Sequence, residues 1–348
     1  MPAPARDPAA DLRRIAFLLE RTQADSYRVR AYRGAADALD AMPPEQVQAR
    51  GAAGTLTSVR GIGAKTAAVA AASLAGEVHD TRAQLERDAQ EPLVVLTGDA
   101  AQLQAALRGD CHTHSDFSDG GSPPLEMARA AREEVGHEWV VLTDHSPRLT
   151  VANGLSPTRL REQLELVARI NDELAPFRLL TGIEVDINPD GTLDQEPDLL
   201  AQLDVVVGSV HSELRMPAPQ MTARMLRAVD NPHLDVLGHC TGRLVAGPRA
   251  PRPRSTFDAE AVVVACVDRG VALEVNARPE RLDPPRDILR LAVEAGCLLS
   301  IDTDAHAPGQ LSWQPYGVAR AVECGAIAER VVTTWSAQKV LAWTSARQ

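Results

Sequence analysis

Short apolar runs recur seven times along residues 108–302, and nearly all of them lead into a histidine or a carboxylate. Patterns typical of helices fill the gaps, for example over residues 125–134, 158–174 and 259–269. Buried strands that alternate with helices predict a parallel sheet. The runs are residues 108–111 before His112, 139–143 before Asp144 and His145, 179–183 before Glu184, 204–210 before His211, 234–238 before His239, 271–275 before Asn276 and 297–301 before Asp302.

Polar residues follow every one of these predicted strands, and this bears on how the sheet is arranged. A closed (β/α) barrel places its functional residues at the carboxyl ends of all its strands. An open doubly wound sheet concentrates its site at one switch point instead. We therefore expect a barrel, with the open sheet as the alternative.

The strand ends carry nine side chains that can bind metal ions. A single histidine at such a place is more often structural, so the inference depends on the whole set. His112 with His114, and Asp304 with His306, are spaced two residues apart, and such residues point to the same side of a strand. Nitrogen and carboxylate ligands without cysteine suit Zn, Mn or Fe. The candidates are His112, His114, Asp119, His145, Glu184, His211, His239, Asp304 and His306.

Nine ligands exceed what one ion can use, so we expect two or three divalent metal ions as cofactors. A carboxylate such as Glu184 can bridge two of them. Clusters of this kind serve hydrolysis, above all of phosphoesters, because they lower the pKa of a bound water and stabilise the entering and leaving oxygens.

The N-terminal residues 1–88 follow a different, helical pattern. Apolar residues at helical spacing mark one helix over residues 12–19 and another over residues 29–39. Gly61-Ile-Gly63 then predicts a tight hairpin between a short helix and an alanine-rich helix that ends near Leu74. Amide groups at the start of that helix favour an anion, and Lys65 can add a charge on the same phosphate. A plain helical turn is the alternative interpretation of these glycines.

Charge is distributed unevenly between these two parts. The whole chain has 36 Lys and Arg against 47 Asp and Glu, a net charge of −11. Residues 1–88 hold 12 against 11, a net of +1, which leaves 24 against 36, a net of −12, for residues 89–348. The chain has two lysines, Lys65 and Lys339, so phosphate binding depends on arginines or backbone amides. Aromatic residues make up 3%, which argues against an extended base-stacking platform.

Composition also excludes several classes of protein. The five cysteines include no CxxC motif, which argues against a disulfide framework and a zinc ribbon. No stretch approaches the roughly 18 apolar residues that a membrane span requires. Residues 1–14 contain no apolar run of the kind found in signal peptides, so we expect a cytoplasmic protein without a membrane partner.

The hairpin sequence at Gly61, Gly63 and Lys65 resembles the helix-hairpin-helix motif of DNA-binding proteins. Residues 7–88 as a whole look like the N-terminal domain of family X DNA polymerases. The resemblance implies non-specific binding of the DNA backbone, through contacts that do not read bases. Some family members carry a Schiff-base lysine for lyase chemistry, but Val69 stands at the matching position here, so we expect no lyase activity.

Residues 108–345 resemble the polymerase and histidinol phosphatase (PHP) superfamily. The matching sequences are HTHSDFSDG at 112–120, TDHS at 143–146, GIEVDI at 182–187, SVHS at 209–212, GHCTGR at 238–243, EVN at 274–276 and SIDTDAH at 300–306. This resemblance implies a distorted (β/α)7 barrel with three metal ions, preceded here by the small all-α domain. The implied sets are His112, His114, Glu184 and Asp304 for the first ion, Glu184, His211 and His239 for the second, and Asp119, His145 and His306 for the third.

One departure from the polymerases matters. Full bacterial family X polymerases carry a palm domain with catalytic aspartates between the helix-hairpin-helix and PHP domains. Here a linker of residues 89–107 joins a domain at 1–88 to a domain at 108–348, and it is far too short for a palm. We therefore expect no polymerase activity.

Arginines near the strand ends are candidates for substrate binding, since a guanidinium group suits phosphate. Arg243 lies four residues after His239 and matches the family sequence, so we expect it to act in catalysis with Asp304 and Glu184. Asn276 and Arg281 follow the sixth predicted strand and are further candidates. The proline-rich loop that carries Arg249, Arg252 and Arg254 either binds substrate or is simply solvated.

These observations favour a metal-dependent phosphoesterase that acts on DNA as a 3′–5′ exonuclease or a 3′-end-processing enzyme. One alternative is a small-molecule phosphatase of the histidinol phosphatase type. Another is a DNA-binding adaptor in which the metals only stabilise the fold. The sequence leaves the physiological metal, the preferred DNA structure and the oligomeric state open.

Overall fold

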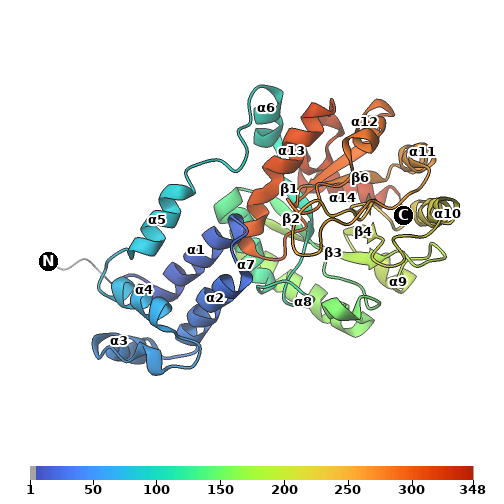
Figure 1. Ribbon diagram of the computed structural model, residues 1–348. Coiled ribbons are helices and arrows are strands. Elements are labelled where there is room, and N and C mark those ends of the chain that lie inside the picture. The colour runs from blue at the N-terminus through green and yellow to red at the C-terminus, as the bar shows by residue number, and fades with distance from the viewer. Residues whose placement is uncertain (1–4, 348) are drawn as a thin grey trace. The chain divides into compact units, whose positions relative to one another are not determined.

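The computed structural model describes residues 5–347, and the chain divides into two compact units between Pro92 and Leu93 (Figure 1). The described part of the first unit consists of helices and loops. Its elements are α1 (Pro8–Arg21), α2 (Ser26–Asp40), α3 (Pro44–Ala52), the short 3-10 helix η1 (Leu56–Ser58), α4 (Ala64–Leu74) and α5 (Asp80–Asp88).

Local sequence explains how the helices of the first unit begin and pack. Asp7 and Asp25 precede α1 and α2, and their carboxylates accept backbone N–H groups of the first helical turn. The predicted apolar stripes bury Leu12 and Leu39 in one core. Arg33 donates two hydrogen bonds to the buried Glu20, at 2.6 and 2.8 Å. This ion pair joins α1 to α2 inside the unit.

The predicted helix-hairpin-helix elements are present. Gly61 has a φ of +93°, a conformation that side chains other than glycine rarely adopt, and it turns the chain after η1. Gly63 then begins α4, and its N–H donates to Thr66 Oγ1 at 3.0 Å. The alanine-rich helix ends at Leu74, as predicted.

The second unit contains a seven-stranded parallel sheet in the order β1 to β7. Strand β7 returns to β1, where Thr113 bridges to Ala305 in parallel, so the sheet forms a nearly closed barrel. The predicted (β/α)7 architecture is confirmed, and the open doubly wound sheet is excluded. The strands are β1 (Gly109–Thr113), β2 (Trp139–Leu142), β3 (Arg178–Asp186), β4 (Val205–Ser209), β5 (Val236–Leu237), β6 (Ala272–Asn276) and β7 (Leu298–Asp302).

Helices connect these strands on the outside of the barrel (Figure 1). The helix expected over residues 125–134 is divided into α7 and a π-helical turn, η2, whereas the other two expected helices are α8 and α11. The helices are α6 (Asp99–Ala106), α7 (Pro124–Ala130), η2 (Ala131–Val135), α8 (Pro157–Leu174), α9 (Pro197–Leu200), α10 (Ala218–Val229), α11 (Ala259–Arg269), α12 (Arg286–Glu294), α13 (Gln314–Glu323) and α14 (Ala337–Ser345), with the short 3-10 helices η3 (Thr150–Ala152), η4 (Pro308–Trp313), η5 (Ala328–Arg330) and η6 (Val332–Thr334).

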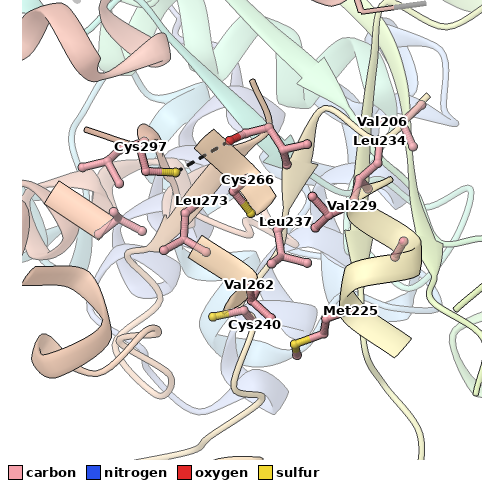
Figure 2. Close-up of a cluster of buried hydrophobic side chains, with 14 of the residues drawn as sticks. Val206, Met225, Val229, Leu234, Leu237, Cys240, Val262, Cys266, Leu273 and Cys297 are labelled. Carbon is pink, nitrogen blue, oxygen red and sulfur yellow. Dashed lines mark hydrogen bonds between the residues drawn. The ribbon is translucent and has the colours of Figure 1, made fainter. Parts of the chain in front are cut away.

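Successive strand residues point to opposite faces of the barrel wall. Val206 and Leu273 belong to the cluster between strands and helices, where Met225 of α10 and Val262 of α11 meet them (Figure 2). The neighbouring Val207 belongs to a separate apolar cluster that also contains residues of α14. Both faces of the strands are therefore buried, which leaves their carboxyl ends for polar residues.

Among residues 5–347, no helix has the length and apolar character that crossing a membrane requires.

Candidate metal centre

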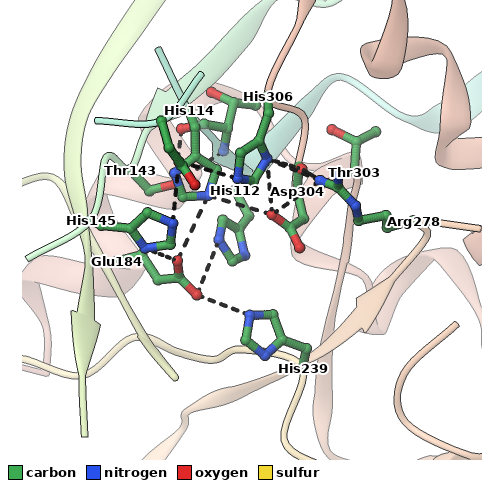
Figure 3. Close-up of polar contacts among 12 residues, drawn as sticks. His112, His114, Thr143, His145, Glu184, His239, Arg278, Thr303, Asp304 and His306 are labelled. Atoms are coloured by element: carbon green, nitrogen blue, oxygen red, sulfur yellow. Dashed lines mark hydrogen bonds and ion pairs between the residues drawn. The ribbon is translucent and has the colours of Figure 1, made fainter. Parts of the chain in front are cut away.

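The structure brings all nine predicted ligands together at the carboxyl ends of the strands. Figure 3 labels those other than Asp119 and His211. Strand alternation and the short loops after the strands explain this convergence, because parallel strands end at the same rim of a barrel. Their donor atoms form four groups, and within each group the atoms lie within 4.8 Å of one another. The groups are His112, His114 and Asp304; His114, Asp119, His145 and His306; His112, Glu184 and His239; and His145, Glu184 and His211.

Glu184 occupies the centre of this cluster. Its Oε1 lies 3.0 Å from His239 Nε2 and 3.3 Å from His211 Nε2, and its Oε2 lies 2.7 Å from His145 Nδ1. Burial favours the neutral acid, but the surrounding His211, His112 and His145 hold the pKa of Glu184 well below its usual value. The carboxylate is therefore ionised and placed to bridge two cations.

The chemistry of the donor set fits metal ions. His112 Nε2, His211 Nε2 and both ring nitrogens of His114 are buried and make no hydrogen bond. Buried polar atoms without partners cost about 1–3 kcal/mol each, so a native structure normally satisfies them. Divalent ions between these nitrogens and the carboxylates of Glu184 and Asp304 would satisfy them together.

The neutral form of the His114 side chain agrees with a role as a metal ligand. Burial lowers the pKa of His114, and the neighbouring His306 and His145 lower it further, well below the usual value. A neutral imidazole is the form that binds a metal. Its Nε2 lies 3.5 Å from Asp304 Oδ1 and 3.7 Å from Glu184 Oε2, so His114 lies between two of the four groups.

The four groups only partly match the three ligand sets that the family resemblance implies. Asp119, His145 and His306 lie together, as the third set requires, and His114 joins them. His112, His114 and Asp304 lie together, as in the first set, but Glu184 of that set belongs to other groups. In the second set, Glu184 Oε1 is close to both His211 and His239. The two histidines nevertheless belong to different groups, because His239 lies with His112 and Glu184, whereas His211 lies with His145 and Glu184.

Two carboxylates that the sequence interpretation missed orient these histidines. Glu274 Oε1 lies 2.6 Å from His112 Nδ1, and Asp186 Oδ1 lies 2.5 Å from His211 Nδ1. Each contact fixes the ring so that its Nε2 faces Glu184, which is how carboxylates support metal-binding histidines. A signal existed for both, because Asp186 is two residues after Glu184, and Glu274 is two residues before Asn276, on the same sides of their strands.

The predicted substrate residues Arg281 and Asn276 lie beside the cluster. Arg281 Nε lies 3.0 Å from Asp304 Oδ2, and Asn276 Nδ2 lies 3.3 Å from the same oxygen. Arg278, which was not singled out, donates to the Asp304 carbonyl at 2.8 Å and packs over Trp313. Both arginines follow β6, so one loop brings two positive charges to the edge of the cluster.

Arg243 has a different environment from the one expected. Its guanidinium group donates to the backbone carbonyls of Arg281, at 3.2 Å, and of Leu282. The backbone N–H of Arg243 donates to Asp283 Oδ2 at 3.2 Å. It does not line the cavity over the metal cluster, and in this position it supports the loop that carries Arg281.

A cavity of about 640 Å³ opens above the cluster. Five predicted ligands reach it, together with four arginines and several aliphatic side chains. The ligands are Asp119, His145, His211, Asp304 and His306, and the arginines are Arg249, Arg252, Arg278 and Arg281.

In the first unit, the structure places Gly61, Gly63 and Lys65 at the hairpin and at the start of α4. Both glycines and the lysine are exposed, which suits contact with a phosphate. Val69, at the position that the family resemblance assigns to the lyase lysine, is 1% exposed.

Comparison with known families and proteins agrees with this two-part organisation. Residues 3–77 match the helix-hairpin-helix domain family, and residues 110–278 match the PHP domain family. The chain is 40% identical over 215 residues to the DNA polymerase/3′-5′ exonuclease PolX of Bacillus subtilis, a match that covers 62% of this chain and 37% of that protein. A probable phosphatase of Thermoanaerobacter sp. is 28% identical over 212 residues, which cover 57% of this chain and 78% of that protein.

Among solved structures, the histidinol phosphate phosphatase of Lactococcus lactis, in complex with zinc, L-histidinol and phosphate, aligns with a TM-score of 0.48 and 18% identity. This alignment covers 63% of this chain and 94% of that one. In the sequence comparisons, the chain spans little more than a third of the length of the PolX relative and most of the length of the probable phosphatase of Thermoanaerobacter sp..

Proposed function

We propose that this chain, which carries a helix-hairpin-helix domain and a PHP domain, is a metal-dependent phosphoesterase that trims the 3′ ends of DNA. The observation that carries the proposal is the convergence of nine metal-binding side chains under one cavity. The helix-hairpin-helix domain favours DNA as the substrate. Residues 89–107 contain little besides α6, so the proposal includes no polymerase activity.

Two or three divalent ions would be held by the nine residues, with Glu184 shared between neighbouring ions. When bound, such ions polarise a phosphate, activate a water at neutral pH and stabilise the entering and leaving oxygens. The donor atoms suit Zn, Mn or Fe, because they combine imidazoles with carboxylates and include no thiolate.

The residues of the chain itself would bind and orient the phosphate group. Arg281 and Arg278 hold positive charge beside Asp304, where they can bind phosphate oxygens that project from the cluster. Glu274 and Asp186 keep His112 and His211 in fixed orientations, so the site does not reorganise when substrate binds. Arg243 would act indirectly, because it donates to the backbone carbonyls of Arg281 and Leu282.

DNA would be held by the hairpin of the first unit. The exposed amides near Gly61 and Gly63 and the charge of Lys65 can bind backbone phosphates without reading bases. The even charge balance of residues 1–88 permits such binding, whereas the second part of the chain is strongly acidic and would repel a bare duplex.

The test uses the purified full chain with manganese or zinc and a single-stranded DNA labelled at its 5′ end. We expect stepwise shortening from the 3′ end, and an Asp304→Asn variant that binds the DNA but does not shorten it. Asp268→Asn, at an exposed carboxylate of α11, serves as the control and should retain activity. Labelled DNA that stays intact with every metal would contradict the proposal.

A small-molecule phosphatase is the second candidate, since a cavity of about 640 Å³ can hold a compact phosphomonoester. Release of phosphate from histidinol phosphate at a much higher rate than nucleotides are released from DNA would favour it. A non-catalytic adaptor is distinguished by Asp304→Asn, which would then change stability and metal content while no hydrolysis is detected in either form.

A further inference from the structure

The loop after β5 folds back as a hairpin that forms one wall of the cavity. Leu244 and Arg252 pair as antiparallel neighbours, with both of their backbone hydrogen bonds at 3.0 Å. Val245 N–H donates to the carbonyl of Glu280 at 2.7 Å, which joins the hairpin to the loop after β6. We call residues 244–252 the arginine hairpin, because Arg249 and Arg252 line the cavity from it.

One nitrogen of the Arg252 guanidinium group makes a hydrogen bond, and the other two are available to a ligand. Its Nε donates to the Gly242 carbonyl at 2.6 Å, and its two terminal nitrogens make no hydrogen bond or ion pair within residues 5–347. The exposed Arg249 side chain makes none either. In contrast, Arg254, just beyond the hairpin, pairs with Asp287 at 2.5 Å and does not line the cavity.

These free guanidinium groups lie next to others of the same charge. Burial lowers the pKa of Arg252, and the nearby Arg281 and Arg249 lower it further. Arg281 in turn contacts Asp304 of the metal cluster at 3.0 Å. Arg281, Arg252 and Arg249 therefore bring positive charge together in the lining of one cavity, and an anion there would relieve the repulsion.

Another part of the cavity lining is aliphatic. Leu149, Val151 and Ala152 line it from the loop after β2 and the short helix η3 (Thr150–Ala152). Val151 is 92% exposed, although apolar side chains of this size are usually covered. A ligand that combines charged groups with an uncharged body, such as the end of a nucleic acid strand, suits a cavity lined by both arginines and aliphatic side chains.

We propose that Arg249 and Arg252 form a second phosphate subsite, which binds the phosphate next to the scissile one. The cavity would then select the end of a nucleic acid strand, where phosphates follow one another, over a compound with a single phosphate. This inference rests on the proposed phosphoesterase function and deepens it. Arg281 and Arg278 serve the scissile phosphate, and the arginine hairpin serves its neighbour.

The experiment compares two thymidine dinucleotides that differ in one group. The dinucleotide dTpdT has one phosphodiester bond, and pdTpdT carries an additional 5′-phosphate next to it. For the full wild-type chain we expect a KM about tenfold lower for pdTpdT, the size of one charge-assisted contact. We expect kcat to be similar for both, because the subsite contacts no reacting atom.

The variants are Arg249→Ala, Arg252→Ala and the double variant, with Arg254→Ala as the matched control. We expect the double variant to lose the preference for pdTpdT and to keep the wild-type KM for dTpdT, whereas Arg254→Ala keeps the preference. Because Arg249 makes no side-chain hydrogen bond or ion pair within the described residues, Arg249→Ala tests the subsite without removing a bond that holds the hairpin. A preference that survives in the double variant, or an equal loss on both dinucleotides, overturns the proposal.

Calorimetric titration with the same two dinucleotides separates this inference from the proposed function. If the wild-type chain hydrolyses neither compound, the phosphoesterase proposal fails, but binding still reports on the subsite. Tighter binding of pdTpdT that disappears in the double variant supports the subsite. Equal binding of the two compounds by the wild-type chain overturns it.

Discussion

Replacing Glu274 by glutamine removes one negative charge from beneath the metal cluster and leaves the size of the side chain unchanged. Glu274 is completely buried, and both of its oxygens are used. Oε1 accepts from His112 Nδ1 at 2.6 Å, and Oε2 accepts from the backbone N–H of His239. One carboxylate therefore orients two metal-binding histidines from different strands.

The magnitude follows from these contacts. Glutamine can accept from one partner through its oxygen, but it presents an NH₂ group to the other, so one of the two histidines loses its support. Loss of such a carboxylate partner typically costs 10–100-fold in metal affinity, or about 1.4–2.7 kcal/mol. We expect Glu274→Gln to weaken metal binding within this range and to lower activity at limiting metal by a similar factor.

The assay is competition for zinc or manganese against a chromogenic chelator, with the unfolding midpoint measured in parallel. Glu323→Gln, at an exposed carboxylate that pairs with Arg286, is the matched control and should bind metal like the wild type. Wild-type metal affinity in folded Glu274→Gln would refute the reasoning, because it would show that His112 needs no fixed orientation. Rescue of activity by excess metal would support it.

Three further predictions concern the helix-hairpin-helix at Lys65, the buried His137 of the second unit and the Arg33–Glu20 ion pair of the first unit. Lys65→Ala should weaken DNA binding and reduce the slope of log affinity against log salt by about one, as measured by fluorescence anisotropy at several salt concentrations. Burial lowers the pKa of His137 to about 4, and its Nε2 lies 2.9 Å from Gln314 Oε1. The native state therefore binds a proton at His137 less readily than the unfolded state does. The free energy of unfolding should be unaffected by His137 above about pH 6.5 and should fall by up to about 3 kcal/mol as the pH decreases to 4. Denaturation at several pH values checks this, and His137→Gln should flatten the dependence. Arg33→Ala should destabilise the first unit by about 3–5 kcal/mol in chemical denaturation, because it removes the guanidinium group that pairs with the buried Glu20 carboxylate.

The barrel and the convergence of the nine candidate ligands could be predicted because their signals are local. Alternation of apolar runs and helices gives the strands, and the residue that follows each run gives the rim of the barrel. The spacing of His112 and His114 then places both side chains on one side. Residues whose role depends on pairing across the barrel were harder to predict. Glu274 lies 162 positions from His112 in the chain. Its spacing from Asn276 places it on the site side of its strand, but no local pattern marks its pairing with His112.

Arg243 also shows that local sequence does not predict contacts between neighbouring loops. It follows His239 by four residues, and closeness in sequence favoured a place in the site. The chain turns at Gly242, which has a φ of +61°, and the Arg243 guanidinium then meets the carbonyls of the next loop. Because neighbours in a barrel come from adjacent strand ends, the arginines that face the cluster belong to the following strand, at Arg278 and Arg281. Arg243 therefore supports the loop that carries Arg281, and closeness to His239 along the chain did not predict which arginines line the cavity.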